Sequence, residues 1–423
     1  MLDYWTSLLR MVSPIERCRI CGNKELVLVI DLGDQFLTGV FPDTPNPSSI
    51  TSGPLQLVKC QGSEEVCGLV QLRHSYQASE MYGAGYGYRS GLNQTMVKHL
   101  QSKVKKIEKL ILLSEEDVVI DIGSNDGTTL REFKIGPQLI GIDPAASKFK
   151  AFYPENCGIV SDFFSRRVAL VATSGKLAKV ITSFAMIYDL EDPITFAKEI
   201  ASILSKDGIW VFEQSYMPFM VERLAYDTIC HEHIEYYGLR QIQWILKAAN
   251  LKIIDVEFND INGGSFSVTA THTSSNYESD HKMIEQILDK EQKDGYMEMD
   301  VYHHFANRVR TSRDEMINVV SKLLSDGKRV IGLGASTKGN VLLQFCNFDS
   351  TSIEAIGDVN PDKHGCFTPG TWIPIISEKN ALLLEPDYFL VLPWHFKSFF
   401  ITSDLFLGRR LIFPLPSFEI ISR

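Results

Sequence analysis

The stretch Val118-Val-Ile-Asp121-Ile-Gly123-Ser-Asn-Asp-Gly127-Thr decides the fold of this chain. Four of the five positions 118–122 are β-branched and apolar, which predicts a buried strand. The two glycines predict a tight turn in which the backbone can approach a ligand closely, and a helix follows. Asp121 ends the strand where a phosphate would need positive charge. We therefore expect a cationic, amino-acid-like ligand here rather than a dinucleotide.

The segments on both sides of this stretch alternate between strand and helix patterns. Helical periodicity appears at 92–113 and 194–204, and apolar strand-like runs appear at 139–142, 180–184, 209–212, 251–258 and 265–271. Such alternation is typical of a doubly wound α/β sheet. A polar helical segment, 276–325, precedes a second strand–loop–helix that starts at 329–333. Short strands around 354–357 and 388–392 predict a smaller parallel sheet there.

Length and composition predict an ordinary globular protein of about three domains. The chain has 423 residues, 44% of them hydrophobic and 22% charged, and a net charge of −10. This composition excludes disordered, collagen-like and disulfide-scaffold classes, and the acidic balance argues against nucleic acid or an anionic membrane as the main partner. With no signal-peptide pattern at residues 1–12 and no long apolar run, we expect a cytoplasmic protein. Without heptads, we expect a monomer.

Four of the eight cysteines lie in the first 75 residues, which otherwise show short apolar runs at 26–32 and 54–59. Cys18 and Cys21 form a Cys-x-x-Cys pair, and Cys60 and Cys67 are more widely spaced. Four thiolates can close a tetrahedral zinc site, and a closed site leaves no position for a substrate. We expect a small, mostly β domain with structural zinc. Unliganded buried cysteines are the alternative.

Further polar residues follow the other predicted strands. Asp143 ends the next strand, where a carboxylate can bind both hydroxyls of a ribose. Ser183 ends the strand 180–184. Three residues after the strand 209–212 are candidates to line the same pocket: Glu213, Gln214 and Tyr216.

Strand, Asp-x-Gly-x-x-x-Gly, strand and Asp together resemble the first two motifs of the class I S-adenosylmethionine-dependent methyltransferases. The resemblance implies that S-adenosylmethionine binds at the first turn, next to Gly123, Ser124, Asn125, Gly127, Asp143 and Pro144. It implies an adenine contact at Asp162 and Phe163. Another nucleotide, or tight strand–helix packing without a ligand, is the alternative.

The sequence His231-Glu232-His233 concentrates titratable groups in one short segment. The histidines are two residues apart, whereas zinc-protease spacing places them one helical turn apart. A histidine oriented by a neighbouring carboxylate is a good general base. We therefore expect a catalytic base here, with His231 and His233 as alternatives for the role. The alternative is that both histidines have a purely structural role.

A second glycine-rich turn, Gly332-Leu-Gly334-Ala-Ser336-Thr337-Lys338-Gly-Asn340, joins a strand to a helix without an acidic residue. A lysine and two hydroxyls suit a phosphate, although the order is not that of a P-loop. We expect Ser336, Thr337, Lys338 and Asn340 to bind a diphosphate, with pure scaffold as the alternative. Trp394 and His395 are expected at the same edge. Upstream, the glycine- and tyrosine-rich segment 82–91, which contains Tyr86 and Tyr88, predicts a polar lid or an interdomain loop.

These motifs in this order resemble the nucleotide-diphospho-sugar C-methyltransferases over nearly the whole chain, with Asn262-Gly-Gly-Ser265 and Leu392-Pro-Trp394-His395 as further matches. The resemblance implies a zinc-binding domain (1–75), a class I methyltransferase domain (76–275) and a helical linker with a second Rossmann-like domain (276–423). It implies methylation at carbon 3 of a 4-keto deoxysugar, with His233 as the base. Glu232, Tyr86 and Tyr88 would lie beside it. Cys230 departs from the tyrosine that the family often has.

The chemistry fits these residues. A ketone acidifies the neighbouring C–H bond, a histidine can remove the proton, and a donor such as Tyr88 can stabilise the resulting oxyanion. O-methylation of a sugar or small molecule is one alternative. A catalytically degenerate, zinc-stapled binding protein is another, and the intact acidic and histidine motifs argue against it.

Overall fold

The computed structural model describes residues 12–62, 65–82, 88–134 and 136–423, and its largest sheet has seven strands. Their order is β12-β13-β10-β9-β6-β7-β8, and only β13 runs antiparallel to its neighbours. The strands are β6 (Val118–Ile122), β7 (Gln138–Ile142), β8 (Cys157–Val160), β9 (Ala178–Phe184), β10 (Leu204–Ser215), β12 (Leu251–Asn259) and β13 (Ser265–His272). The predicted doubly wound sheet is confirmed, with β8 as a strand that the sequence pattern did not indicate.

Helices cover both faces of this sheet because its central strands are apolar on both sides. All five residues of β6 are buried. On one face, Val104 and Ile107 pack against Val180. On the other, Ile200 packs in the cluster that contains Phe212. The helices are α3 (Gln94–Leu110), α4 (Arg166–Ala172), α5 (Pro193–Ile203) and α7 (Leu239–Ala248).

The described residues between 12 and 75 form a mostly β unit, as predicted, but they do not complete their own sheet. Its four strands have the order β11-β4-β3-β2, with bounds β2 (Leu26–Phe36), β3 (Ser52–Cys60), β4 (Val70–Leu72) and β11 (Glu235–Tyr236). A short pair, β1 (Ser13–Pro14) with β5 (His74–Ser75), lies outside it. Because β11 begins two residues after His233, the small sheet anchors the His-Glu-His segment.

The second α/β unit holds a six-stranded sheet with the order β16-β15-β14-β17-β18-β19, in which β19 is antiparallel. Its helices are α10 (Thr337–Phe345), α11 (Glu378–Leu383) and α12 (Lys397–Thr402). Its strands are β14 (Val330–Leu333), β15 (Ile356–Asp358), β16 (Ile375–Ser377), β17 (Tyr388–Val391), β18 (Arg410–Phe413) and β19 (Glu419–Ser422). The predicted smaller parallel sheet is confirmed and extended at both edges.

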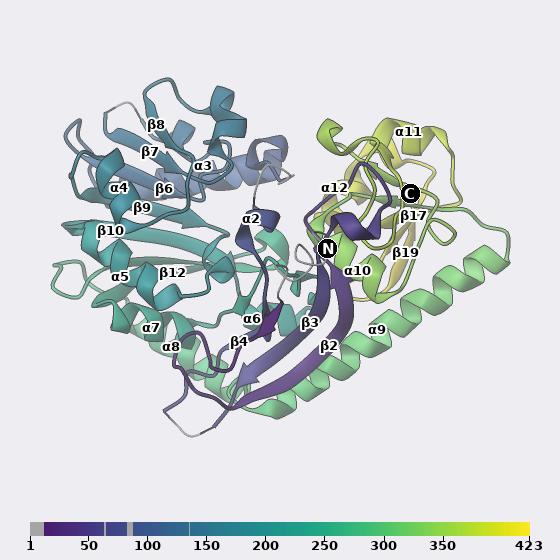
Figure 1. Ribbon diagram of the computed structural model, residues 1–423, viewed down its shortest axis with the longest axis horizontal. Coiled ribbons are helices and arrows are strands. Elements are labelled where there is room, and N and C mark those ends of the chain that lie inside the picture. The colour runs from purple at the N-terminus through teal and green to yellow at the C-terminus, as the bar shows by residue number, and fades with distance from the viewer. Residues whose placement is uncertain (1–11, 63–64, 83–87, 135) are drawn as a thin grey trace, which may run out of the picture.

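Helices α8 (His281–Lys293) and α9 (Met299–Ser325) form the predicted helical link. Figure 1 shows α9 running from beneath the first α/β unit to the second, with β2 and β3 alongside it. Two short helices, α2 (Ala78–Met81) and α6 (Met217–Glu222), lie near the junction. No helix in the described part of the chain is both long enough and apolar enough to cross a membrane.

Candidate active site

A cavity of about 360 Å³ opens at the carboxyl ends of β6, β7 and β9. Ligands of doubly wound sheets bind at this edge. Seven of the ten predicted cofactor residues line it: Asp121, Gly123, Ser124, Asn125, Asp143, Pro144 and Phe163. The cavity is therefore where the sequence placed the cofactor.

The other three predicted cofactor residues do not line this cavity. The buried Ser183 hydroxyl instead accepts the indole N–H of Trp210 at 2.9 Å. Asp162 is exposed and caps the N–H of Phe163. Gly127 has a φ of +71°, and a Cβ there would lie 2.9 Å from the ring of Tyr153. Its glycine serves the turn itself and its packing.

Hydrogen bonds orient the two carboxylates of the cavity. The Thr182 hydroxyl donates to Asp121 at 2.6 Å, and burial raises the pKa of Asp121 to about 7. Asp143 accepts the backbone N–H groups of Asn125 at 2.9 Å and Ala145 at 2.7 Å, and burial raises its pKa too. Each carboxylate is thus fixed while it faces the cavity. A cationic ligand with ribose hydroxyls suits this pair.

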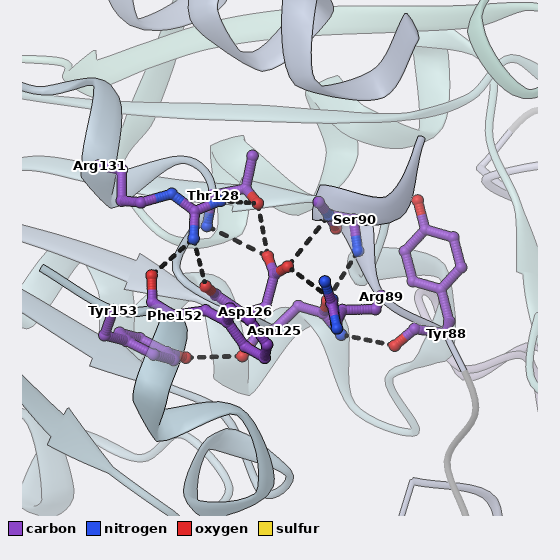
Figure 2. Close-up of polar contacts among 10 residues, drawn as sticks. Tyr88, Arg89, Ser90, Asn125, Asp126, Thr128, Arg131, Phe152 and Tyr153 are labelled. Carbon is purple, nitrogen blue, oxygen red and sulfur yellow. Dashed lines mark hydrogen bonds and ion pairs between the residues drawn. The ribbon is translucent and has the colours of Figure 1, made fainter. Parts of the chain in front are cut away.

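Asn125 connects the segment that begins at Tyr88 to the first glycine-rich turn by hydrogen bonds. Its side-chain oxygen accepts the N–H of Ser90 at 3.0 Å, and its amide donates to the Tyr88 carbonyl at 3.1 Å. Asp126 adds a bond from Gly91 N–H at 3.1 Å (Figure 2). Tyr88 and Ser90 thereby become walls of the cofactor cavity.

The two predicted tyrosines of this segment have different outcomes. Tyr86 lies outside the described residues. The Tyr88 side chain is 46% exposed and lies at the cofactor cavity. Figure 2 shows its ring apart from the hydrogen bonds that hold its backbone.

The His233 segment contacts a residue of the cavity wall. The Tyr82 hydroxyl, from a residue that lines the cavity, donates to the carbonyl of Glu232 at 3.0 Å. The Ile234 N–H donates to the Tyr188 carbonyl at 2.9 Å, and the Tyr188 ring packs on the His233 ring with centroids 4.2 Å apart. The His-Glu-His segment is thus held against the cofactor site from both sides.

The His233 ring lies with Nδ1 3.1 Å from the carbonyl oxygen of Thr228. A carbonyl can only accept, so Nδ1 carries the proton and Nε2 keeps its lone pair. Burial, followed by the nearby charge of Lys338, lowers the pKa of His233 to about 3. The ring is therefore neutral at physiological pH and can accept a proton at Nε2.

The structure corrects the role expected for the neighbouring carboxylate. Glu232 does not orient a histidine, because its side chain points the other way and accepts the Thr38 hydroxyl at 3.0 Å. A Cβ on Gly39 would lie 2.2 Å from the Glu232 carboxylate and 3.4 Å from the Thr337 hydroxyl. Glu232 thus sits where the N-terminal and C-terminal units meet. Burial raises its pKa.

His231 is buried against the edge of the Tyr76 ring, with centroids 4.6 Å apart. This contact places it in the N-terminal unit, away from the cavity. Of the two alternatives, His233 is the histidine that lies at the candidate site. Cys230, which precedes His231, is fully buried, and its carbonyl accepts the His233 N–H at 3.1 Å.

Residues predicted from the C-terminal motifs converge on the same place. Lys338 donates to the Asn262 carbonyl at 2.7 Å. The Trp394 indole N–H donates to Asp227 at 2.8 Å, and a Cβ on Gly263 would touch the Trp394 ring at 3.5 Å. His395 follows Trp394, and burial and the charge of Lys338 lower its pKa to about 3.

Two other residues of the second glycine-rich turn serve the fold. The Ser336 hydroxyl caps α10 by accepting the Gly339 N–H at 3.0 Å. The buried Asn340 amide donates to the Thr38 carbonyl at 2.7 Å, which ties α10 to the N-terminal unit. Thr337 faces Glu232, as described above.

The three residues predicted after the strand 209–212 do not line the cofactor cavity. Glu213 lies 2.6 Å from His99 and 2.9 Å from Lys103, and the His99 hydrogen bond and the Lys103 charge lower its pKa despite burial. The Tyr216 hydroxyl donates to Glu291 at 2.8 Å. Gln214 is buried within β10. The side chains of Glu213 and Tyr216 are thus committed to packing contacts beneath the site.

Sequence reasoning missed three contributors. The Thr228 carbonyl is a backbone group and carries no sequence signal. Asp227 stands in the same polar stretch as the histidines and was a detectable candidate. Asp189, in a short 3₁₀ turn (Ile187–Asp189) after β9, lines the cavity, and the rule that ligands meet the carboxyl ends of strands could have found it.

The four N-terminal cysteines come together as predicted. The sulfurs of Cys18, Cys21, Cys60 and Cys67 lie within 4.8 Å of one another. The Asn23 amide lies 3.4 Å from the Cys60 sulfur. A closed set of four thiolates fits a structural zinc ion and leaves no ligand position for chemistry.

Comparisons with known proteins cover the chain in order. Three family models match: a zinc binding domain over residues 18–82, a methyltransferase domain over 96–256 and a C-methyltransferase C-terminal domain over 260–416. Among solved structures, magnesium protoporphyrin IX methyltransferase from Synechocystis PCC 6803 with bound SAH is 13% identical, covers 43% of this chain and 87% of its own, and has a TM-score of 0.32. The YcgJ protein from Bacillus subtilis is 16% identical, covers 40% and 98%, and has a TM-score of 0.32.

One curated relative matches along almost the entire length. The C-methyltransferase NovU from Streptomyces niveus is 30% identical over 421 residues, which is 97% of this chain and 98% of NovU. The match spans the cysteine cluster, the cofactor cavity and the C-terminal unit. The chain therefore belongs to the S-adenosylmethionine-dependent C-methyltransferases.

Proposed function

We propose that this enzyme transfers a methyl group from S-adenosylmethionine to carbon 3 of a nucleotide-linked 4-keto deoxysugar, with His233 as the general base. The observation that carries the proposal is the hydrogen bond from His233 Nδ1–H to the Thr228 carbonyl, which leaves Nε2 free on a segment that the cavity residue Tyr82 contacts. The substrate class rests on the motif resemblance described above.

S-adenosylmethionine suits the described cavity. Asp143 accepts the ribose hydroxyls, and the aromatic Phe163 packs on the adenine. Asp121 and Asp189 give the cavity an acidic lining, which favours a ligand with an ammonium and a sulfonium group. The methyl group then faces the side of the cavity that Tyr82 lines, where the Tyr82 hydroxyl bonds the Glu232 carbonyl next to His233.

The residues around His233, Asn262 and the start of α10 suit the sugar nucleotide. The substrate ring lies between His233 and the Asn262 loop, and its diphosphate approaches the backbone at the N-terminal end of α10, away from the Lys338 ammonium. The backbone N–H groups of a helix N-terminus favour anions. In this arrangement Thr337 and Trp394 contact the nucleotide portion.

The reaction needs only proton removal and in-line transfer. His233 takes the proton from carbon 3, and the resulting enolate carbon attacks the methyl group of the sulfonium. Holding the two reactants in register supplies much of the rate. The zinc site keeps the N-terminal unit folded and takes no part in these steps.

Product analysis by NMR tests this proposal. The enzyme is mixed with ¹³C-methyl S-adenosylmethionine and a freshly generated nucleotide-linked 4-keto-6-deoxy sugar. We expect a labelled methyl group bonded to carbon 3, with the ketone retained. A labelled methoxy group would show O-methylation instead. No transfer, with the cofactor bound, would show that this sugar class is wrong.

A further inference from the structure

Lys338 occupies a position that its sequence motif did not indicate. It stands in the first turn of α10, which packs against the 3₁₀ turn Tyr226–Thr228. That turn supplies Asp227 and the carbonyl that holds His233. The same short turn therefore sets the positions of both the lysine and the base.

The ammonium of Lys338 is enclosed at the junction of three segments. It donates to the Asn262 carbonyl at 2.7 Å, which uses one of its three N–H donors. Asn262 itself adopts a left-handed conformation, with φ at +56°, and the adjacent Gly263 packs under Trp394. Trp394 in turn binds Asp227 at 2.8 Å. These contacts link Lys338, the Asn262 loop, Trp394 and Asp227 in one cluster.

Charges in this cluster act on one another. The charge of Lys338 lowers the pKa of both His233 and His395, whereas Asp227 and Cys230 oppose the fall that burial causes in the pKa of Lys338. Glu232 lies on the other side of the segment. Lys338 thus stands on the helix that packs against the turn holding His233, and its charge acts on that ring.

We propose that the ammonium of Lys338 binds the ketone oxygen of the sugar and stabilises the negative charge that develops there during proton removal. This inference rests on the proposed function and revises the diphosphate role expected from the sequence. The diphosphate is attached to carbon 1, across the sugar ring from carbon 4. A cation beside the base that takes the carbon 3 proton meets the carbon 4 oxygen instead.

The steps balance without any further reactant. The proton of carbon 3 goes to His233 Nε2, and the C–H electron pair becomes the carbon 3–carbon 4 double bond. The π pair of the ketone moves to its oxygen, where Lys338 faces it. When the enolate collapses, carbon 3 bonds to the methyl carbon and the S–CH₃ pair stays on sulfur as the thioether.

The test compares Lys338→Met and Lys338→Arg with Lys328→Met, a control lysine that is partly exposed and paired with Asp387. Three quantities are measured for each: deuterium exchange at carbon 3 without cofactor, the rate of methyl transfer, and the Kd for thymidine diphosphate and uridine diphosphate. Affinity for S-adenosylhomocysteine checks that each variant is folded.

We expect Lys338→Met to slow exchange and transfer together by about 10²–10³-fold, as loss of an oxyanion donor does. Its Kd for nucleoside diphosphates should stay within about twofold of the wild-type value. Loss of a diphosphate contact worth about 1.4 kcal/mol would instead raise this Kd tenfold. Lys338→Arg retains the charge and should recover part of both rates. Removing the charge also raises the pKa of His233, so the acid limb of kcat/KM should move to higher pH in Lys338→Met.

A diphosphate role predicts the opposite pattern. If Lys338→Met weakens nucleoside diphosphate binding at least tenfold and leaves exchange at carbon 3 unchanged, the inference is wrong. The inference would also be wrong if Lys338→Arg lost as much of both rates as Lys338→Met and the pH profile of Lys338→Met did not move. A purely structural role for Lys338 gives that result. Absence of methyl transfer by the wild-type enzyme would instead refute the proposed function, so the two failures are distinguishable.

Discussion

A backbone carbonyl sets the protonation of His233. The Thr228 carbonyl oxygen lies 3.1 Å from Nδ1. Because a carbonyl oxygen can only accept a hydrogen bond, Nδ1 carries the proton and Nε2 is free. From the sequence, we expected the carboxylate of the adjacent residue Glu232 to orient the ring. Residues 231 and 232 lie in a turn closed by the bond from the His233 N–H to the Cys230 carbonyl, and the Glu232 side chain bonds Thr38 instead of the ring. The sequence thus indicated the histidine segment, whereas the carbonyl that bonds the ring carries no sequence signal.

The low pKa of His233 predicts an unusual pH profile. Burial and Lys338 both disfavour the imidazolium, so the folded-state pKa falls to about 3 and the neutral base persists throughout the range above it. We expect kcat/KM to show no loss from this group between pH 8 and pH 5. The measurement is kcat/KM over that range, with circular dichroism to confirm folding. A half-loss near the ordinary histidine pKa of about 6.5 would contradict the assignment.

Asp143 and Asp162 form a matched pair for cofactor binding. Asp143 faces the cavity, whereas Asp162 is exposed outside it. Asp143→Asn loses charge-assisted hydrogen bonds to the ribose worth about 1.5–3 kcal/mol, or roughly 10–100-fold in Kd. Calorimetry with S-adenosylhomocysteine should show this loss and no change for Asp162→Asn. Equal Kd values for the two variants would place the ribose elsewhere.

Among the elements, those with strong patterns were predictable and the shortest were not. The apolar run at 118–122 corresponds to β6, which is buried on both faces, and the periodic segment at 194–204 corresponds to α5, which is buried on one face. In each case the burial determines which sequence positions are apolar. The two residues of β11 are too few to show any period. Its pairing with β4 depends on chain segments far apart in sequence.

Because β11 joins the cysteine-rich sheet to the His-Glu-His segment, zinc removal should reach the active site. Chelation under reducing conditions should loosen β3 and β4, speed amide exchange at Glu235–Tyr236 and lower methyl transfer, and added zinc should reverse all three. Mass spectrometry of exchanged peptides and a metal analysis provide the measurements. Unchanged exchange and activity after demonstrated zinc loss would refute this coupling.

The whole molecule behaves as one packed body, not as three separate domains. A single core cluster joins Leu57 of β3, Tyr226 near the site and Ile331 of β14. Figure 1 shows β2 and β3 between the two α/β units, beside α9. Sequence composition located the three units, but their shared core arises from contacts between distant segments and could not be predicted from the chain order.

This continuity predicts one calorimetric unfolding transition. Asn340→Ala removes the bond from α10 to the buried Thr38 carbonyl, at a cost of about 1–3 kcal/mol for the unpaired group. The entire transition should shift to a lower Tm. Scanning calorimetry that resolves a separate, earlier transition for one unit in this variant would contradict a common core.

Deuterium incorporation at carbon 3 tests the central claim most directly. The enzyme and a nucleotide-linked 4-keto-6-deoxy sugar are incubated in deuterated water without S-adenosylmethionine, and mass spectrometry follows the sugar. Wild type and the control His303→Ala, an exposed residue of α9, should exchange the proton, whereas His233→Asn should not while still binding S-adenosylhomocysteine. Exchange at the wild-type rate in His233→Asn would show that another group is the base.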